Sequence, residues 1–220
     1  MNGPLSGKMA MVTGASGGVG LVAARALAQT GCGVYVMGRN FVATEQAASD
    51  IRSDYGVEAE AHTGNPANPA DADVLALAGS DAEFFFNCAG NVPRGSLDDI
   101  TDEAWRKSWE SAVFGPLNLV REMAGHMGDE GRGLIVLVID APEAPLAGDI
   151  CASAAGAALR AVVQALSQTL PQGVRILGLI TGREVPDPGR LSFAFTRLAL
   201  EPGRFATGSL LSVADIDTDE

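Results

Sequence analysis

A glycine-rich turn constrains the fold of this chain more than any other feature of its sequence. The segment TGASGGVG, residues 13–20, follows an apolar run at 8–13 and leads into an amphipathic helical pattern at 18–30. Glycines there let the chain turn sharply off a strand and leave room for an anion at the helix N-terminus, where free N–H groups and the helix dipole favour negative charge. Placed between a first strand and a first helix, the turn predicts a nucleotide-binding α/β unit. The alternative is a turn that serves only close packing of the helix on the strand.

Short apolar runs alternate with longer helical patterns along the whole chain. Several runs are apolar on both faces, as buried parallel strands are. The alternation predicts a Rossmann-type doubly wound parallel sheet of about seven strands with helices on both faces, in a single domain spanning 1–220. The expected strands are 8–13, 32–37, 57–62, 82–87, 133–139, 174–180 and 210–213. The expected helices are 18–30, 41–54, 68–78, 101–126, 150–169 and 190–200, followed by a frayed acidic tail at 214–220.

The composition argues against some classes of binding partner and indicates a cellular compartment. The net charge of −12 argues against nucleic acid and anionic membrane surfaces, and its simplest interpretation is solubility. No run approaches the ~18 apolar residues of a membrane span, and the N-terminus lacks the apolar segment of a secretion signal. Cys32, Cys88 and Cys151 show no metal-ligand spacing, which predicts free thiols and no metal site. We therefore expect a soluble, cytoplasmic protein.

Several motifs resemble those of the short-chain dehydrogenase/reductase family. TGASGGVG is similar to that family's TGxxxGxG cofactor turn, and NCAG at 87–90 to its NNAG motif, with Cys88 replacing the second asparagine. Segments 95–127, 131–140, 174–182 and 206–215 resemble later elements of the family, so the likeness covers nearly the whole chain. The resemblance implies a dinucleotide site made by Gly14, Ser16, Gly18, Val19, Gly20, Arg39, Asn65, Asn87, Ala89 and Gly90.

The end of the second expected strand indicates which dinucleotide would bind. In the family, an acidic residue there selects NAD, whereas a basic residue just beyond it accommodates the 2′-phosphate of NADP. Here VYVMGRN has Gly38 at the acidic position and Arg39 next to it. A guanidinium suits a phosphate, so the expected cofactor is NADP; the alternative is a solvent-exposed arginine. Asn65 stands for the family's aspartate after the third strand, and its amide oxygen could accept a hydrogen bond from adenine.

The catalytic residues that the resemblance implies are missing. The family uses a tyrosine as proton donor, a lysine four residues later, a serine and an asparagine, because proton transfer needs a hydroxyl with a suitably lowered pKa. Their aligned positions are occupied by Ala152, Gly156, Asp140 and Ala112, respectively. No Tyr-x-x-x-Lys occurs anywhere in the chain, and neither residue type occurs after position 107. The ordinary chemistry of the family is therefore not expected.

Two further features agree with that expectation. The family's substrate lid, which would follow Gly182, is reduced here to REVPDPGR at 183–190, which would leave a substrate unshielded from water. A carboxylate at Asp140 would repel a developing oxyanion. Asp140 is interpreted as a structural hydrogen-bond acceptor, with a replacement acid or base as the alternative.

The leading hypothesis is a non-catalytic subunit that pairs with an active homologue in a hetero-oligomeric oxidoreductase, such as a hydroxyacyl-CoA or ketone/alcohol dehydrogenase, and still binds NADP(H). Two alternatives remain open: an NADP(H)-responsive regulator, and an atypical NAD(P)-dependent oxidoreductase that uses Asp140 as its base. Helix 150–169 is apolar on more than one face and rich in small residues, which favours close packing against a partner. By the resemblance, the partner would dock on helices 101–126 and 150–169 and on the last strand. Trp105 and Trp109 could serve that interface or the core, and His62 and His126 are interpreted as structural.

Overall fold

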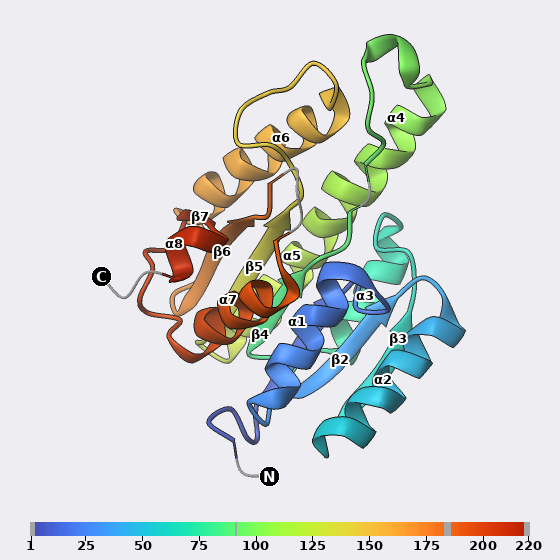
Figure 1. Ribbon diagram of the computed structural model, residues 1–220. Helices are drawn as coiled ribbons and strands as arrows, with labels where there is room; N and C mark the ends of the chain where they lie inside the picture. The colour runs from blue at the N-terminus through green and yellow to red at the C-terminus, as the bar shows by residue number, and fades with distance from the viewer. Residues whose placement is uncertain (1–2, 91, 183–185, 218–220) are drawn as a thin grey trace.

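Seven parallel strands form one sheet, in the order β3-β2-β1-β4-β5-β6-β7 (Figure 1). The structure, a computed structural model, describes residues 3–90, 92–182 and 186–217. The order reverses between β1 and β4, as in a doubly wound nucleotide-binding sheet, so the predicted fold is confirmed. The strands are β1 (Met9–Thr13), β2 (Gly33–Gly38), β3 (Ala59–Thr63), β4 (Phe84–Asn87), β5 (Gly133–Ile139), β6 (Val174–Ile180) and β7 (Leu210–Ser212).

Helices cover both faces of the sheet. Helices α1, α2 and α7 pack on one face, and α3, α5 and α6 on the other, while α4 rises beyond the carboxyl ends of the strands (Figure 1). The helices are α1 (Gly18–Gln29), α2 (Phe41–Tyr55), α3 (Pro69–Ala78), α4 (Asp102–Trp109), α5 (Gly115–Asp129), α6 (Ile150–Leu166), α7 (Pro188–Leu200) and α8 (Val213–Asp217).

The two-residue period of a strand explains why a central strand such as β4 is apolar on both faces. Successive side chains of a strand point to opposite faces, so Phe84 and Phe86 of β4 enter the core beneath α1 and α7, and Phe85 enters the core beneath α5. Phe86 meets Phe195 of α7 edge to face, with 5.7 Å between ring centroids. Both faces of β4 are thus buried, and this strand does not need to alternate polar and apolar residues.

Two expected elements differ from the observed ones. The helix expected at 101–126 is interrupted by a π-helical segment, Glu110–Phe114, which separates α4 from α5. The tail expected to fray from residue 214 instead begins with the short helix α8, because Ile216 is fully buried in the core. The expected short connection at 183–190 lies partly outside the described residues; β6 ends at Ile180, and α7 already begins at Pro188.

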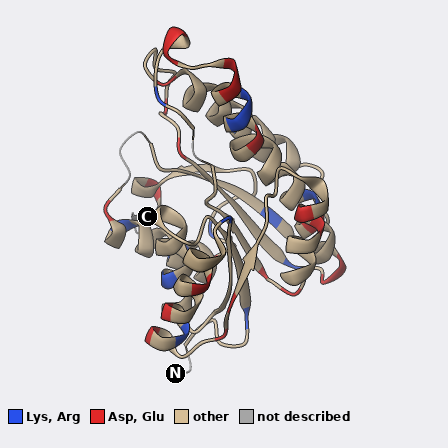
Figure 2. Cartoon of the chain, turned by 90° about the vertical axis from the view of Figure 1, so that its right-hand side faces the viewer, with Lys and Arg blue, Asp and Glu red and all other residues tan. Residues whose placement is uncertain are grey.

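Charged residues are concentrated on the outer helices and loops, and the sheet itself carries few (Figure 2). None of the helices in the described part of the chain has both the length and the apolar composition required to span a bilayer. The three cysteines are free; Cys32 and Cys151 are buried, and Cys88 is partly exposed. Burial raises the pKa of the Cys32 thiol to about 12, so that this thiol is expected to be unreactive.

Candidate functional site

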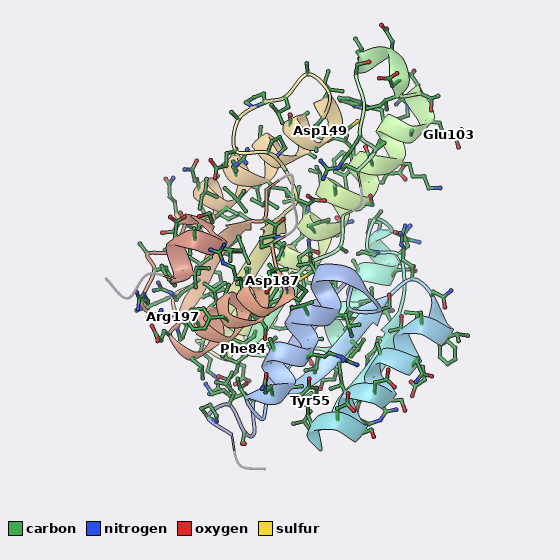
Figure 3. All side chains as sticks on the ribbon, viewed as in Figure 1. Tyr55, Phe84, Glu103, Asp149, Asp187 and Arg197 are labelled. Carbon is green, nitrogen blue, oxygen red and sulfur yellow. The ribbon has the colours of Figure 1, made fainter. Side chains whose placement is uncertain are left out.

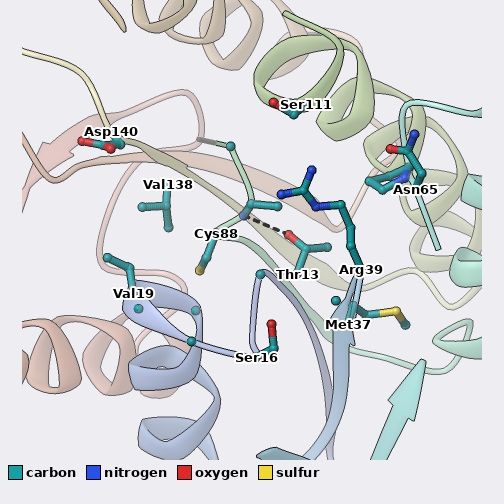
Figure 4. Close-up of a pocket in the computed structure, with 18 of the residues that line it drawn as sticks. Thr13, Ser16, Val19, Met37, Arg39, Asn65, Cys88, Ser111, Val138 and Asp140 are labelled. Atoms are coloured by element: carbon teal, nitrogen blue, oxygen red, sulfur yellow. Dashed lines mark hydrogen bonds between the residues drawn. The ribbon is translucent and has the colours of Figure 1, made fainter. Parts of the chain in front are cut away.

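A cavity of about 380 Å³ opens at the carboxyl ends of the central strands (Figure 4). Its walls come from the turns after β1, β2, β3, β4, β5 and β6, together with the π-helical segment before α5. This is where ligands bind in open α/β sheets, at the point where the strand order reverses. The volume lies in the range typical of small-molecule sites, about 300–1,000 Å³. We call this cavity the cleft.

The glycine-rich turn forms the floor of the cleft at the N-terminus of α1. Gly17 caps the helix without any side-chain hydrogen bond, so the N–H groups of the first turn have no capping side chain. A Cβ atom at Gly17 or Gly18 would meet nothing within 4 Å, whereas one at Gly20 would lie 2.3 Å from the carbonyl oxygen of Gly14. Gly20 therefore permits close packing, and Gly17 and Gly18 leave open space in front of the helix. These glycines fit an anionic group such as a pyrophosphate.

A closed set of hydrogen bonds holds the turn after β4 against the end of β1. The hydroxyl of Thr13 donates to Oδ1 of Asn87 (2.8 Å), Nδ2 of Asn87 donates to the carbonyl of Ala89 (3.1 Å), and the N–H of Ala89 donates to the Thr13 hydroxyl (3.3 Å; dashed in Figure 4). Asn87 is buried and does not line the cleft, although it was expected among the ligand-contacting residues. It instead positions Ala89 and Gly90, which do line the cleft.

Arg39 and Asn65 lie together at one end of the cleft (Figure 4). Beside them, a Cβ atom at Gly38 would lie 2.3 Å from Oγ1 of the buried Thr44, so an acidic side chain does not fit there without rearrangement. Oδ1 of Asn65 accepts a hydrogen bond from the N–H of Ala67 (3.3 Å). The amide oxygen that was expected to face adenine is therefore already hydrogen-bonded within the turn. Arg39 is the basic group at this end of the cleft.

The other end of the cleft carries a carboxylate, Asp140, at the end of β5 (Figure 4). Nη2 of Arg94 lies 3.5 Å from Oδ1 of Asp140, and Nη1 of the same guanidinium lies 3.1 Å from Oδ2 of Asp149. The Asp149 side chain is 1% exposed and stands just before α6, whereas that of Asp140 is 40% exposed. Desolvation raises the pKa of Asp140; Arg94 opposes this effect and Asp149 adds to it. Figure 3 shows Asp149 above the sheet, beside the start of α6.

Small residues occupy the remaining aligned catalytic positions, and they serve close packing. A Cβ atom at Gly156 would lie 2.3 Å from Cβ of Ala141, and one at Gly90 would lie 3.3 Å from Cα of Ala112. Ala152 is 1% exposed. Helix α6 therefore lies directly against the end of β5, and the π-helical segment lies against the turn after β4. Of the four aligned positions, Asp140 alone is found among the described residues that line the cleft.

Ser111 lines the cleft and was not expected to. An uninterrupted α-helix would place residues by its 3.6-residue period, but the π-helical turn Glu110–Phe114 contains an extra residue and shifts that register. The Ser111 hydroxyl donates to the carbonyl of Ser108 (3.1 Å). Arg94 and Asp149 also had no signal in the sequence, because 55 positions separate the two partners.

The tyrosines and lysines of the chain all lie away from the cleft. The Tyr35 hydroxyl donates to Asp81 (2.9 Å), and Lys8 pairs with Glu83 (3.1 Å) next to the amino ends of β1 and β4. Tyr55 ends α2 at the lower side of the sheet (Figure 3). Lys107 is exposed on α4. Among the described residues, no tyrosine or lysine contributes to the wall of the cleft.

The two histidines are also outside the cleft. His62 lies 3.3 Å from Glu60 and packs edge-on against Tyr35, and His126 is in the last turn of α5. Over the described ranges, no three His, Cys, Asp or Glu side chains come together as a metal site would require.

Residues 8–183 match the model of the family described as short chain dehydrogenase. A protein named "Dehydrogenase/reductase SDR family member 4", from Pongo abelii, is 28% identical over 202 residues, covering 89% of this chain and 70% of that protein. The 2-keto-3-deoxy-L-fuconate dehydrogenase of Xanthomonas campestris pv. campestris is 31% identical over 138 residues, covering 61% of this chain and 43% of that one.

Solved structures are similar over nearly the whole chain. A "short chain dehydrogenase/reductase family protein" superposes with a TM-score of 0.84 at 27% identity, covering 96% of this chain and 97% of the other. L-Sorbose reductase from Gluconobacter frateurii, solved in complex with NADPH and L-sorbose, has a TM-score of 0.86 at 21% identity, covering 96% and 97% of the two chains. At that identity the likeness concerns the fold alone. All residues that line the cleft fall within the segment matched by the family model.

Proposed function

This chain belongs to the short chain dehydrogenase family, and from that premise we propose that it is a non-catalytic member, which holds NADP(H) and supports an active homologue. The observation that carries the proposal is the contrast between the two ends of the cleft. One end offers an open anion site at α1 and a guanidinium at Arg39; the other contains Asp140, and no phenol or ammonium group among the described residues. Such a cleft retains groups that bind a dinucleotide and lacks the family's proton-transfer pair.

Three parts of the chain would hold the cofactor. The first turn of α1 would receive the pyrophosphate, and Arg39 with Ser16 would receive a 2′-phosphate at the Gly38 side of the cleft. The turn at Ala89 and Gly90 would support the nicotinamide half. A bound nicotinamide supplies or takes up a hydride. The residues of this chain orient that group and offer, at Asp140, a carboxylate in place of a proton donor.

The purified chain tests this proposal directly. NADPH should bind, as seen by enhancement of its fluorescence, while a panel of ketones, hydroxyacyl-CoA thioesters and alcohols should give no cofactor turnover above the buffer blank. Steady turnover by the chain alone would overturn the proposal. If that turnover is lost in Asp140→Asn, the rival hypothesis of an oxidoreductase with Asp140 as its base would replace it.

Arg39 is expected to select NADP(H) over NAD(H). Replacing Arg39 with Ala removes a charge-assisted contact to the 2′-phosphate, so affinity for NADPH should fall about 10- to 100-fold. Affinity for NADH, which has no 2′-phosphate, should stay within about twofold. Parallel fluorescence titrations with the two cofactors measure both values. An equal loss for both cofactors would assign Arg39 a general structural role.

The proposed partner is an active homologue that packs on α4, α5 and α6 and on β7. On α6, the outward positions Ala157, Ala161 and Ala165 are all exposed alanines, which permit close helix approach. Phe114 on the neighbouring π-helical segment is 52% exposed, and β7 is an edge strand of the sheet. These features support a shared interface in a hetero-oligomeric oxidoreductase, with a hydroxyacyl-CoA or ketone/alcohol dehydrogenase as the active subunit.

Ala161→Arg tests this surface. The helix propensity of arginine is close to that of alanine, and Ala161 is exposed. The variant should therefore keep its fold. A long charged side chain would keep the helices apart, and recovery of the active homologue with the tagged chain from the native cell should fall at least about tenfold. Ser49→Arg on the exposed side of α2 is the matched control and should co-purify normally. Undiminished recovery with Ala161→Arg would place the partner elsewhere.

A further inference from the structure

Side chains of opposite charge line the two ends of the cleft. Arg39 marks one end and Asp140 the other, with the glycine-rich turn between them (Figure 4). Because a pyrophosphate would lie at the N-terminus of α1 and the 2′-phosphate toward Arg39, the nicotinamide half of a bound dinucleotide would extend the opposite way. That direction leads to the ends of β4, β5 and β6, where Val138, Asp140 and Thr181 line the cleft.

Among the described residues, Asp140 places a carboxylate at this end of the cleft, with Arg94 beside it. Arg94 is shared by two carboxylates, and its shorter contact is with the buried Asp149, at 3.1 Å compared with 3.5 Å to Asp140. Asp140 is the member of the pair that lines the cleft. Its partial desolvation, which raises its pKa, also means that a nearby cation would be only partly screened.

The two redox forms of the cofactor differ in charge at the nicotinamide ring. The oxidised ring carries a positive charge and the reduced ring is neutral, while the adenosine and pyrophosphate parts are the same. We propose that Asp140 makes the cleft selective for the oxidised form, NADP+, over NADPH. This inference rests on the proposed binding of NADP(H), and it makes the chain a subunit whose occupancy follows the oxidised fraction of the cofactor pool.

The size of the effect follows from the electrostatics. A unit charge several ångströms away, at an effective dielectric constant of about 20 and partly offset by Arg94, should shift the ratio of the two affinities on the order of tenfold. A ligand without the nicotinamide does not carry the distinguishing charge and should be indifferent to Asp140. The comparison of ligands therefore isolates the charge on the ring from every other contact.

The test measures three dissociation constants, for NADP+, NADPH and adenosine 2′,5′-bisphosphate, by isothermal titration calorimetry with the wild-type chain and Asp140→Asn. We expect the variant to bind NADP+ about tenfold more weakly, with the other two constants within about twofold. Glu143→Gln is the matched control, because Glu143 is an exposed carboxylate in the same loop that does not line the cleft. It should leave all three constants unchanged. If Asp140→Asn is poorly folded, Asp140→Ser provides a second neutral variant.

Each outcome decides a different point. If Asp140→Asn leaves the ratio of the NADP+ and NADPH constants unchanged, Asp140 does not select the redox form and this inference fails, while the proposed cofactor binding stands. If Glu143→Gln shifts the ratio as much, the effect is a general one of surface charge and the inference also fails. If the wild-type chain binds none of the three ligands, the proposed function fails, and the inference falls with it.

Discussion

Replacing Gly17 with Asp is expected to weaken NADP(H) binding by at least about 100-fold while leaving the fold as stable as before. Gly17 has φ 179°, an extended conformation open to any residue, and its Cβ would enter free space. Aspartate is a favoured N-cap and would satisfy free N–H groups of α1 with its own carboxylate. The same carboxylate would occupy the anion site and repel the pyrophosphate. NADPH titration and thermal unfolding of the same sample measure the two effects.

Gly17→Ser is the control that separates charge from capping. Serine also caps a helix and adds a side chain of similar reach, but it brings no negative charge, so it should lose far less affinity than the aspartate variant. Full-strength NADPH binding by Gly17→Asp would show that the anion site is not at the N-terminus of α1. The proposed orientation of the cofactor in the cleft would then be wrong.

Restoring the family's tyrosine and lysine is expected to destabilise the fold and to create no activity. In the double variant Ala152→Tyr/Gly156→Lys, a Cβ atom at position 156 would lie 2.3 Å from Cβ of Ala141. Position 152 is equally enclosed, with Ala152 only 1% exposed. Overpacking and burial of an ammonium group together should cost at least about 3 kcal/mol, a large part of the 5–15 kcal/mol of a typical domain. Urea unfolding gives the loss, and ketone reduction with NADPH should stay at the blank.

Gly125→Lys provides the matched comparison for that loss. Gly125 is also a helical glycine, on α5, but it is exposed and its Cβ would meet nothing within 4 Å. Lysine is a better helix former than glycine by up to about 1 kcal/mol, so this variant should be at least as stable as the wild type. A Gly156→Lys protein with wild-type stability, or a double variant that reduces ketones, would show that the family's catalytic space is still available in this chain.

Most of the fold could be predicted because it depends on local patterns. The alternation of apolar runs and helical periods is set by residues near one another in sequence, and it located all seven strands and the principal helices. The short α8 was missed because it is held by Val213 and Ile216, whose burial depends on a core formed by residues distant in the sequence. The π-helical interruption at 110–114 was missed for a similar reason, since one extra residue in a turn leaves no periodic signal over so short a segment.

The candidate site was predicted unevenly. The glycine turn and Arg39 could be located because each directly follows a strand, and the ends of parallel strands meet at one edge of the sheet. Asn87 also follows a strand, yet its side chain turns inward to bond Thr13, which no spacing rule reveals. Ser111, which lines the cleft, lies in the π-helical segment that the sequence pattern did not predict.

The amino-acid sequence by itself determined which residue types are present and in what order. It contains a strand–glycine turn–helix unit able to receive a phosphate, and it has no tyrosine or lysine after position 107. The presence or absence of a residue type does not depend on geometry, because folding cannot supply a residue that the chain lacks. Only the tertiary structure decided how the replacement residues are used. It brought Arg94, Asp140 and Asp149 into one charged cluster at the end of the cleft, and it placed Gly156 against Ala141. Contacts between residues far apart in sequence depend on how the sheet and helices pack, and that packing is a property of the whole fold.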